Sequence, residues 1–274
     1  MTENKKEDLD LIKACEDGYL EKVKSIINSG VDINKKYEDR KNVTALIVAS
    51  NNGNLDIVKC LVENGANVHA NDNDGWTALM RALDNSHFKV ADYLLEKGAD
   101  INAQNINGAT ALIIASSYAY LEHGYLKIVK YLLEKDADIN IKNRSNSTAL
   151  IEASSIGCLE IVQDILAEVE KGKKFDINDK DNCGFSALMY ALNKGRTDIA
   201  ECLRKKGADI NTRDYNGWTP LMCASYNGHS EIVKYLIKNK ADVNIENNDK
   251  KTALDLAKNE EIRKLLIEAK KNNK

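Results

Sequence analysis

Short apolar stretches separated by polar turns recur along this chain at nearly constant intervals. Seven of these stretches begin with Thr-Ala-Leu or a close variant, at positions 44, 77, 110, 148, 186, 219 and 252. The successive spacings are therefore 33, 33, 38, 38, 33 and 33 residues. A fixed period of this length is typical of a repeat protein, in which each unit stacks on its neighbours.

Each unit is expected to contain a turn, a short helix, a second turn and a longer helix. Thr77 can cap the first helix, and Leu79 and Ala82 lie three residues apart, on one face of that helix. Glycines such as Gly53 and Gly228 can end the first helix in the left-handed conformation. Neither helix can bury its apolar face alone, so adjacent units must stack to form one core.

Two further sequence blocks recur after the Thr-Ala-Leu start. They are Ile-Val-Lys at 57–59, 128–130 and 232–234, and Gly-Ala-Asp-Ile-Asn at 98–102 and 207–211. Together the three blocks resemble the ankyrin repeat family over nearly the whole chain. The resemblance implies an all-α ankyrin-repeat solenoid of helix-turn-helix units joined by short hairpin turns. One departure is consistent: the histidine that follows Thr-Pro-Leu in the family is an apolar residue in six units and Asp255 in the seventh. The polar tie from this histidine to the turn is missing, which predicts more loosely held turns.

We expect residues 1–274 to form a single ankyrin-repeat domain. The first unit lacks the Thr-Ala-Leu start and the last carries many charges, so both are interpreted as capping repeats. Two internal units each hold five additional residues, at 116–123 and 168–174. The first is expected to lengthen the first helix or widen the inter-helix loop, and the second to extend the second helix or the loop after it. The predicted division is 5–34 for the N-terminal capping repeat, 35–69, 70–102, 103–140, 141–178, 179–211 and 212–244 for the internal repeats, and 245–274 for the C-terminal capping repeat and tail.

Composition narrows the class of partner. The 39 basic and 42 acidic residues nearly cancel, leaving a formal net charge of −3, which argues against nucleic acid as a partner. No apolar run approaches the ~20 residues that membrane insertion requires. The six cysteines are scattered, without a Cys-x-x-Cys pair, and residues 1–10 do not resemble a secretory signal. We therefore expect a monomeric cytoplasmic protein with reduced thiols, and secretion as an effector is the alternative.

No catalytic, cofactor-binding or metal-binding constellation stands out, so we expect no enzyme, no cofactor and no metal. Residues 69, 87, 123 and 229 are the four histidines, and their places in the repeat favour packing or capping. Glycines occur singly at turns, without a phosphate-binding pattern. The alternative is a small-ligand or catalytic site built on the insertions and lined by Tyr118, Tyr120, Glu122 and His123.

The resemblance implies that partners bind a concave face formed by the turn tips and the exposed side of the first helix. Tyrosine and tryptophan often dominate interface energies, and Tyr215, Trp218 and Tyr226 are expected to cluster in one unit. The alternative interpretation is that an aromatic residue after the turn glycine simply covers the neighbouring turn. The residues that the repeat register assigns to partner binding are Asp74, Trp76, Tyr118, Phe185, Tyr215, Trp218, Tyr226 and Asn227.

The sequence therefore predicts a non-enzymatic scaffold or adaptor that binds another protein. A secreted effector acting on host proteins through the same surface is the alternative, because the physics of binding is the same in both cases. No residue pattern identifies the partner.

Overall fold

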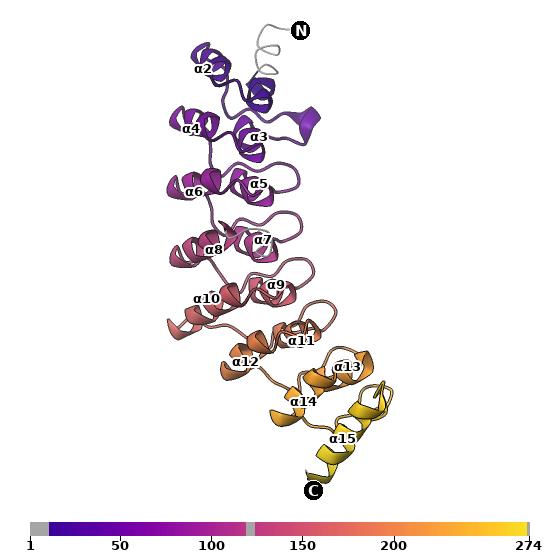
Figure 1. The fold of residues 1–274 in the computed structure, drawn as a ribbon. Helices are drawn as coiled ribbons and strands as arrows, with labels where there is room; N and C mark the ends of the chain where they lie inside the picture. Colours follow the sequence, from indigo (N-terminus) through magenta and orange to yellow (C-terminus); the bar gives the residue numbers. More distant parts are fainter. Residues whose placement is uncertain (1–10, 119–123, 273–274) are drawn as a thin grey trace. The chain divides into compact units, whose positions relative to one another are not determined.

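The computed structural model describes residues 11–118 and 124–272, and within them the chain is all-α apart from isolated β-bridges. This confirms the predicted fold class. Residues 11–17 form a helix, followed by α2 (Leu20–Asn28) and the short η1 (Glu38–Arg40). Helix pairs then follow in the order that the repeat predicts (Figure 1): α3 (Ala45–Asn51) with α4 (Leu55–Glu63), α5 (Ala78–Asp84) with α6 (Phe88–Glu96), α7 (Ala111–Tyr118) with α8 (Gly124–Glu134), α9 (Ala149–Ile156) with α10 (Leu159–Glu170), α11 (Ala187–Asn193) with α12 (Thr197–Lys205), and α13 (Pro220–Asn227) with α14 (Ser230–Lys238), before α15 (Glu260–Asn272).

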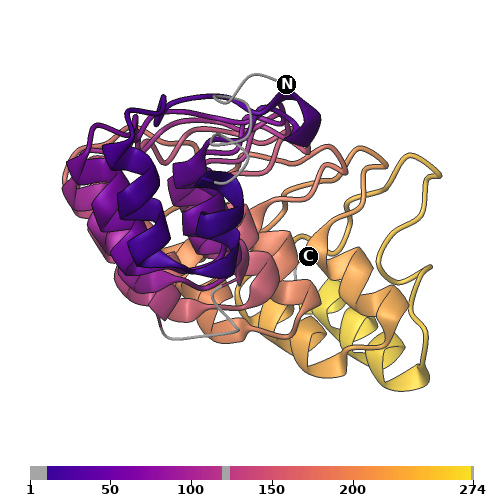
Figure 2. The same ribbon diagram turned by 90° about the horizontal axis from the view of Figure 1, so that it is seen from above.

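The chain divides into two compact units, Met1–Arg144 and Ser145–Lys274. In the first unit, α3 packs on α5 and α5 on α7, while α4, α6 and α8 form a parallel row behind them. In the second unit, α9, α11 and α13 form the first row, and α10 packs on α12 behind it. Within each unit the connecting turns lie on one side of the helix pairs (Figure 2). Each unit therefore has two layers of helices bordered by a row of turns.

The starts and ends of the first helices follow from local chemistry. The Thr77 hydroxyl accepts a hydrogen bond from the Met80 backbone N–H at 3.3 Å, and Thr44, Thr110, Thr148, Ser186 and Thr219 make the equivalent bond. This confirms the predicted N-caps, which satisfy backbone donors that the first turn leaves free. Gly157 and Gly228, at φ of +88° and +82°, end α9 and α13 in the left-handed conformation.

Tyr125 is a central core residue to which the sequence pattern assigned no role. Its side chain is fully buried at the start of α8, and its hydroxyl donates to the Leu83 carbonyl at 2.7 Å. The Phe88 ring meets it edge-on, with ring centroids 4.9 Å apart. A Cβ atom at Gly124 would lie 2.3 Å from the Phe88 ring, so glycine is needed beside this aromatic pair. The pair fills the junction between α5, α6 and α8.

The two insertions have different outcomes. α10 has 12 residues where α4 has 9, so the second insertion extends the second helix, as one of the two predicted alternatives has it. Glu168 near its end is buried and pairs with Lys171 and Lys173 at 2.6 and 2.9 Å. At the first insertion, α7 is described as far as Tyr118, and Tyr120, Glu122 and His123 lie outside the described residues.

The last repeat contradicts one expectation. A first helix was expected to begin after Thr252, but residues 251–259 contain only turns and a bend. Thr252 donates both its backbone N–H and its hydroxyl to Asp255 Oδ2, at 2.8 and 2.7 Å, whereas the other caps use the hydroxyl as an acceptor. A carboxylate thus replaces the apolar anchor of the other units and closes a local turn instead. The predicted repeat boundaries and capping roles stay predictions.

Candidate functional site

An aspartate or asparagine side chain holds five of the described turns from within, and four of these five side chains are buried. Asp72 Oδ1 accepts hydrogen bonds from the backbone N–H groups of Asp74 and Trp76, both at 2.9 Å. Such bonds replace the missing histidine tie, so the expectation of loosely held turns is wrong where this pattern occurs. The same pair of backbone bonds is made by Asn105, Asp181, Asp214 and Asn247.

Successive turns are also bonded to one another. In the first unit the Ile106 backbone N–H donates to the Asp74 carbonyl at 2.8 Å, and in the second the Asn248 N–H donates to the Asn216 carbonyl at 3.0 Å. The packing is close: a Cβ atom at Gly75, where φ is +75°, would lie 2.8 Å from Asn105 Cα. We call the turn tips and the exposed side of the first helices of a unit its turn face. Its side chains project from a rigid backbone.

In the first unit the predicted contact residues are engaged within the chain. The Arg81 guanidinium lies 4.4 Å from the centroid of the Trp76 ring and pairs with Asp72 at 2.7 Å. The Asp72 side chain is completely buried, so this ion pair neutralises a charge that would otherwise be costly. Asp74 forms an ion pair with Lys41 at 2.8 Å, and the Tyr118 hydroxyl donates to Asp84 at 3.2 Å.

Phe185, in the second unit, is engaged in a similar way. Its ring packs against Tyr190 with centroids 5.3 Å apart. The Tyr190 hydroxyl donates to Asp181 Oδ2 at 2.6 Å. Burial, together with this hydrogen bond to a carboxylate, raises the pKa of the Tyr190 phenol well above its ordinary value. The hydroxyl therefore stays a proton donor over the physiological pH range.

The last predicted set differs, because its half-buried tryptophan, Trp218, pairs with an exposed tyrosine. Trp218 and Tyr226 form an edge-to-face pair with ring centroids 5.4 Å apart, and Tyr226 is 58% exposed. Asn227 is exposed beside them. Tyr215 does not complete a three-ring cluster: among the described residues it makes no ring contact with this pair. Its ring lies close to Gly184 instead: a Cβ atom added at Gly184 would be 3.0 Å from Tyr215 Cγ. Tyr215 therefore covers the preceding turn.

The residues that sequence reasoning missed are the turn carboxylates and the positions paired with them. Asp72, Trp76 and Arg81 lie at fixed offsets of four and nine residues, and Asp181, Phe185 and Tyr190 repeat these offsets. This spacing was a usable signal. The spacing matters because the folded turn brings the residue nine positions after the carboxylate, Arg81 or Tyr190, into contact with that carboxylate. This contact is visible only in the folded structure.

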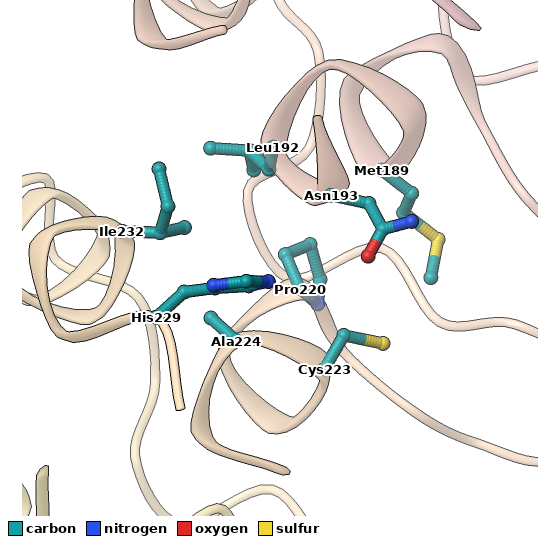
Figure 3. A pocket seen from close by; sticks show the side chains of 8 residues that line it. All are labelled: Met189, Leu192, Asn193, Pro220, Cys223, Ala224, His229 and Ile232. Carbon is teal, nitrogen blue, oxygen red and sulfur yellow. The ribbon is translucent and has the colours of Figure 1, made fainter. Parts of the chain in front are cut away.

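His87 and His229 each lie at the start of a second helix, α6 and α14. His87 Nε2 lies 3.0 Å from the Asn51 carbonyl, at the end of α3, which is the predicted capping role. A pocket beside His229 and Cys223 is bordered by Met189 (Figure 3). Its volume of about 10 Å³ admits at most one water molecule. Within residues 11–118 and 124–272, no cluster of three potential metal ligands forms, and no helix is long and apolar enough to span a membrane.

The cysteines differ enough in exposure to predict their reactivity. All six are free, Cys183 is exposed, and burial raises the pKa of Cys15 and of Cys223 to about 12. At pH 8 this lowers the thiolate fraction of Cys15 and Cys223 by about a thousandfold relative to an ordinary thiol. We expect iodoacetamide to modify Cys183 first and Cys15 and Cys223 last, as measured by peptide mass spectrometry over time. Cys183→Ser should remove the fast phase, and rapid modification of Cys15 in the folded protein would contradict its assigned burial.

Paired antiparallel helices, stacked through shared cores and joined by hydrogen-bonded turns, define a helical repeat protein. A family model for ankyrin repeats (three copies) matches residues 11–105, 118–214 and 211–274. The chain belongs to the ankyrin repeat family, whose repeats are generally protein–protein interaction modules and typically non-catalytic. No curated protein matches the chain.

Proposed function

We propose that this chain is a non-enzymatic scaffold that binds another protein through the turn face of its second unit. The observation that carries the proposal is the ring pair formed by the half-buried Trp218 and the exposed Tyr226. Large aromatic side chains lose little conformational entropy on binding and bury much apolar area, so they are frequent interface hot spots. The equivalent aromatic residues Trp76 and Phe185 already pack against Arg81 and Tyr190 of their own repeats.

The rigidity of the turns supports the same assignment. Asp214 holds the Trp218 backbone N–H at 2.7 Å, and the turn that follows bonds to Asn216. A side chain presented on a fixed backbone loses less freedom when a partner binds. Trp218 and Tyr226 are therefore better placed for recognition than residues on a mobile loop.

We expect Trp218→Ala combined with Tyr226→Ala to weaken partner binding by about 2 kcal/mol, or roughly 30-fold, without loss of folding. The partner is first captured from a lysate of the native organism and identified, and its affinity is then measured by isothermal titration calorimetry. Tyr19→Ala, which removes an equally exposed tyrosine from the first unit, is the matched control. An unchanged affinity of the double variant, with unaltered circular dichroism, would remove this pair as the hot spot.

We further propose that the protein acts as a monomer in a reducing, cytoplasmic environment. The six free thiols support this location, because free cysteines persist where glutathione and thioredoxin keep them reduced.

A further inference from the structure

We infer that Asp214 and Trp218 together bind the guanidinium group of an arginine side chain that the partner protein presents. This inference rests on the proposed function, since it names the chemistry that the turn face of the second unit recognises. It comes from a comparison between two repeats of the same chain, one of which already holds such a group.

The repeat that contains Trp76 provides the template. There the turn carboxylate of Asp72 is followed after four residues by the indole and after nine residues by Arg81. The Arg81 guanidinium lies 4.4 Å from the ring centroid and 2.7 Å from the second carboxylate oxygen, Oδ2. An aromatic face and a carboxylate thus hold one cation between them. Both interactions favour a planar guanidinium.

The repeat that contains Trp218 keeps the carboxylate and the indole but not the cation. Asp214 and Trp218 occupy the first two positions, and Cys223 stands where the template has Arg81. Asp214 Oδ1 accepts hydrogen bonds from two backbone N–H groups, as Asp72 Oδ1 does in the template. The other carboxylate oxygen, Asp214 Oδ2, receives no hydrogen bond from any described residue. The cysteine side chain is several atoms too short to reach across the indole as an arginine does.

No described neighbouring group pairs with Asp214 in the way that Arg81 pairs with Asp72. Arg213 directs its guanidinium to the carbonyl groups of Gly217 and Glu246, at 3.3 and 2.9 Å, and so does not pair with Asp214. Tyr226 meets Trp218 at an interplanar angle of 86°, and one edge-to-face contact covers at most one face of an indole. In the repeat before it, Tyr190 donates to the equivalent oxygen of Asp181 at 2.6 Å. Asp214 has no such donor among the described side chains.

A guanidinium fits this arrangement better than an ammonium group. Its plane can stack on the indole while its N–H groups point along the plane toward the carboxylate. The compact ammonium of lysine is more strongly hydrated and cannot stack in this way. The occupant is therefore an arginine of the partner, with Trp218 and Asp214 as its anchors.

The test uses the full chain and the peptide Gly-Arg-Gly as the probe, with Gly-Lys-Gly as its comparison. The two indole N–H resonances, from Trp76 and Trp218, report on the two sites in one nitrogen-15 NMR titration. We expect the arginine peptide to shift the Trp218 resonance and leave that of Trp76 unmoved, because Arg81 occupies the template site. Cys223→Arg should fill the second site from within the chain and weaken peptide binding by about tenfold or more.

The reciprocal variant, Arg81→Cys, should open the template site, so that the arginine peptide then shifts the Trp76 resonance. If this variant does not fold, Cys223→Arg still decides the question. An unmoved Trp218 resonance, equal binding of the lysine peptide, or unchanged arginine binding by Cys223→Arg would each overturn the inference.

The natural partner separates this inference from the proposed function. If the partner binds wild type and Cys223→Arg equally but loses affinity for the Trp218→Ala/Tyr226→Ala variant, the scaffold proposal holds and the arginine site is wrong. If the arginine peptide binds selectively but the double variant keeps full affinity for the partner, the guanidinium site stands as a property of the chain and the proposed binding surface fails.

Discussion

Tyr125→Ala is expected to lower the free energy of unfolding by about 3–5 kcal/mol, as for other large aromatic residues truncated in a core. The side chain is fully buried, packs edge-on against Phe88 and donates its hydroxyl to the Leu83 carbonyl at 2.7 Å. The substitution therefore leaves a cavity at the junction of α5, α6 and α8 and also removes the donor from a carbonyl group. Equilibrium urea unfolding followed by circular dichroism measures the change.

Two further variants divide this effect into its parts. Tyr125→Phe keeps the ring and removes only the hydroxyl, so we expect a smaller loss of about 1–3 kcal/mol from the lost hydrogen bond. Tyr19→Ala removes an exposed tyrosine of the same unit, and its effect should stay within about 0.5 kcal/mol. A loss for Tyr125→Ala no greater than that for Tyr19→Ala would show that Tyr125 is not a core residue.

Leu112→Ala should cost about 2–5 kcal/mol of unfolding free energy, because it empties a packed position. Leu112 is only 1% exposed in α7, a helix that packs against both α5 and α8. Since repeat units depend on their neighbours for stability, the loss should appear in the cooperative unfolding of the first unit. Urea unfolding of the full chain again provides the measurement.

The volume-conserving change Leu112→Met should cost less than about 1.5 kcal/mol, which separates cavity formation from a general intolerance of substitution. Ile106→Ala, at an exposed apolar residue on a turn of the same unit, is the surface control. If Leu112→Ala costs under about 1 kcal/mol, the helix face that the repeat pattern assigns to the core is wrong.

The regular part of the fold could be predicted because the same capping residue and the same spacing of apolar residues recur in several units. Thr77 and five equivalent residues each cap a helix, and the leucine two residues after the cap is buried in all six units. Prediction failed at Thr252, where one residue, Asp255, changed the chemistry of the cap. A pattern shared by six units hid the effect of a single carboxylate in the seventh.

The candidate site could be predicted only as a set of positions. The repeat register identified Trp76, Phe185 and Trp218 as equivalent. It did not predict that Trp76 and Phe185 pack against the residue nine positions after the turn carboxylate, whereas Trp218 pairs with the exposed Tyr226. That distinction depends on the residue nine positions after the turn carboxylate: Arg81, Tyr190 or Cys223. Arg81 and Tyr190 fold back over their own turns and bond to the turn carboxylate, whereas Cys223 is too short to do so.

The amino-acid sequence by itself determined the family, the helix pairs, their caps and the kind of surface that the repeats present. These follow from short-range rules: a hydroxyl three residues before the backbone N–H that it caps, and apolar side chains at helical spacing. The tertiary structure alone decided that Tyr125 is a core residue, that Asp72 is neutralised by Arg81, and that Trp218 pairs with the exposed Tyr226. These contacts join residues from different elements, and their free energies depend on burial and geometry that no local spacing encodes.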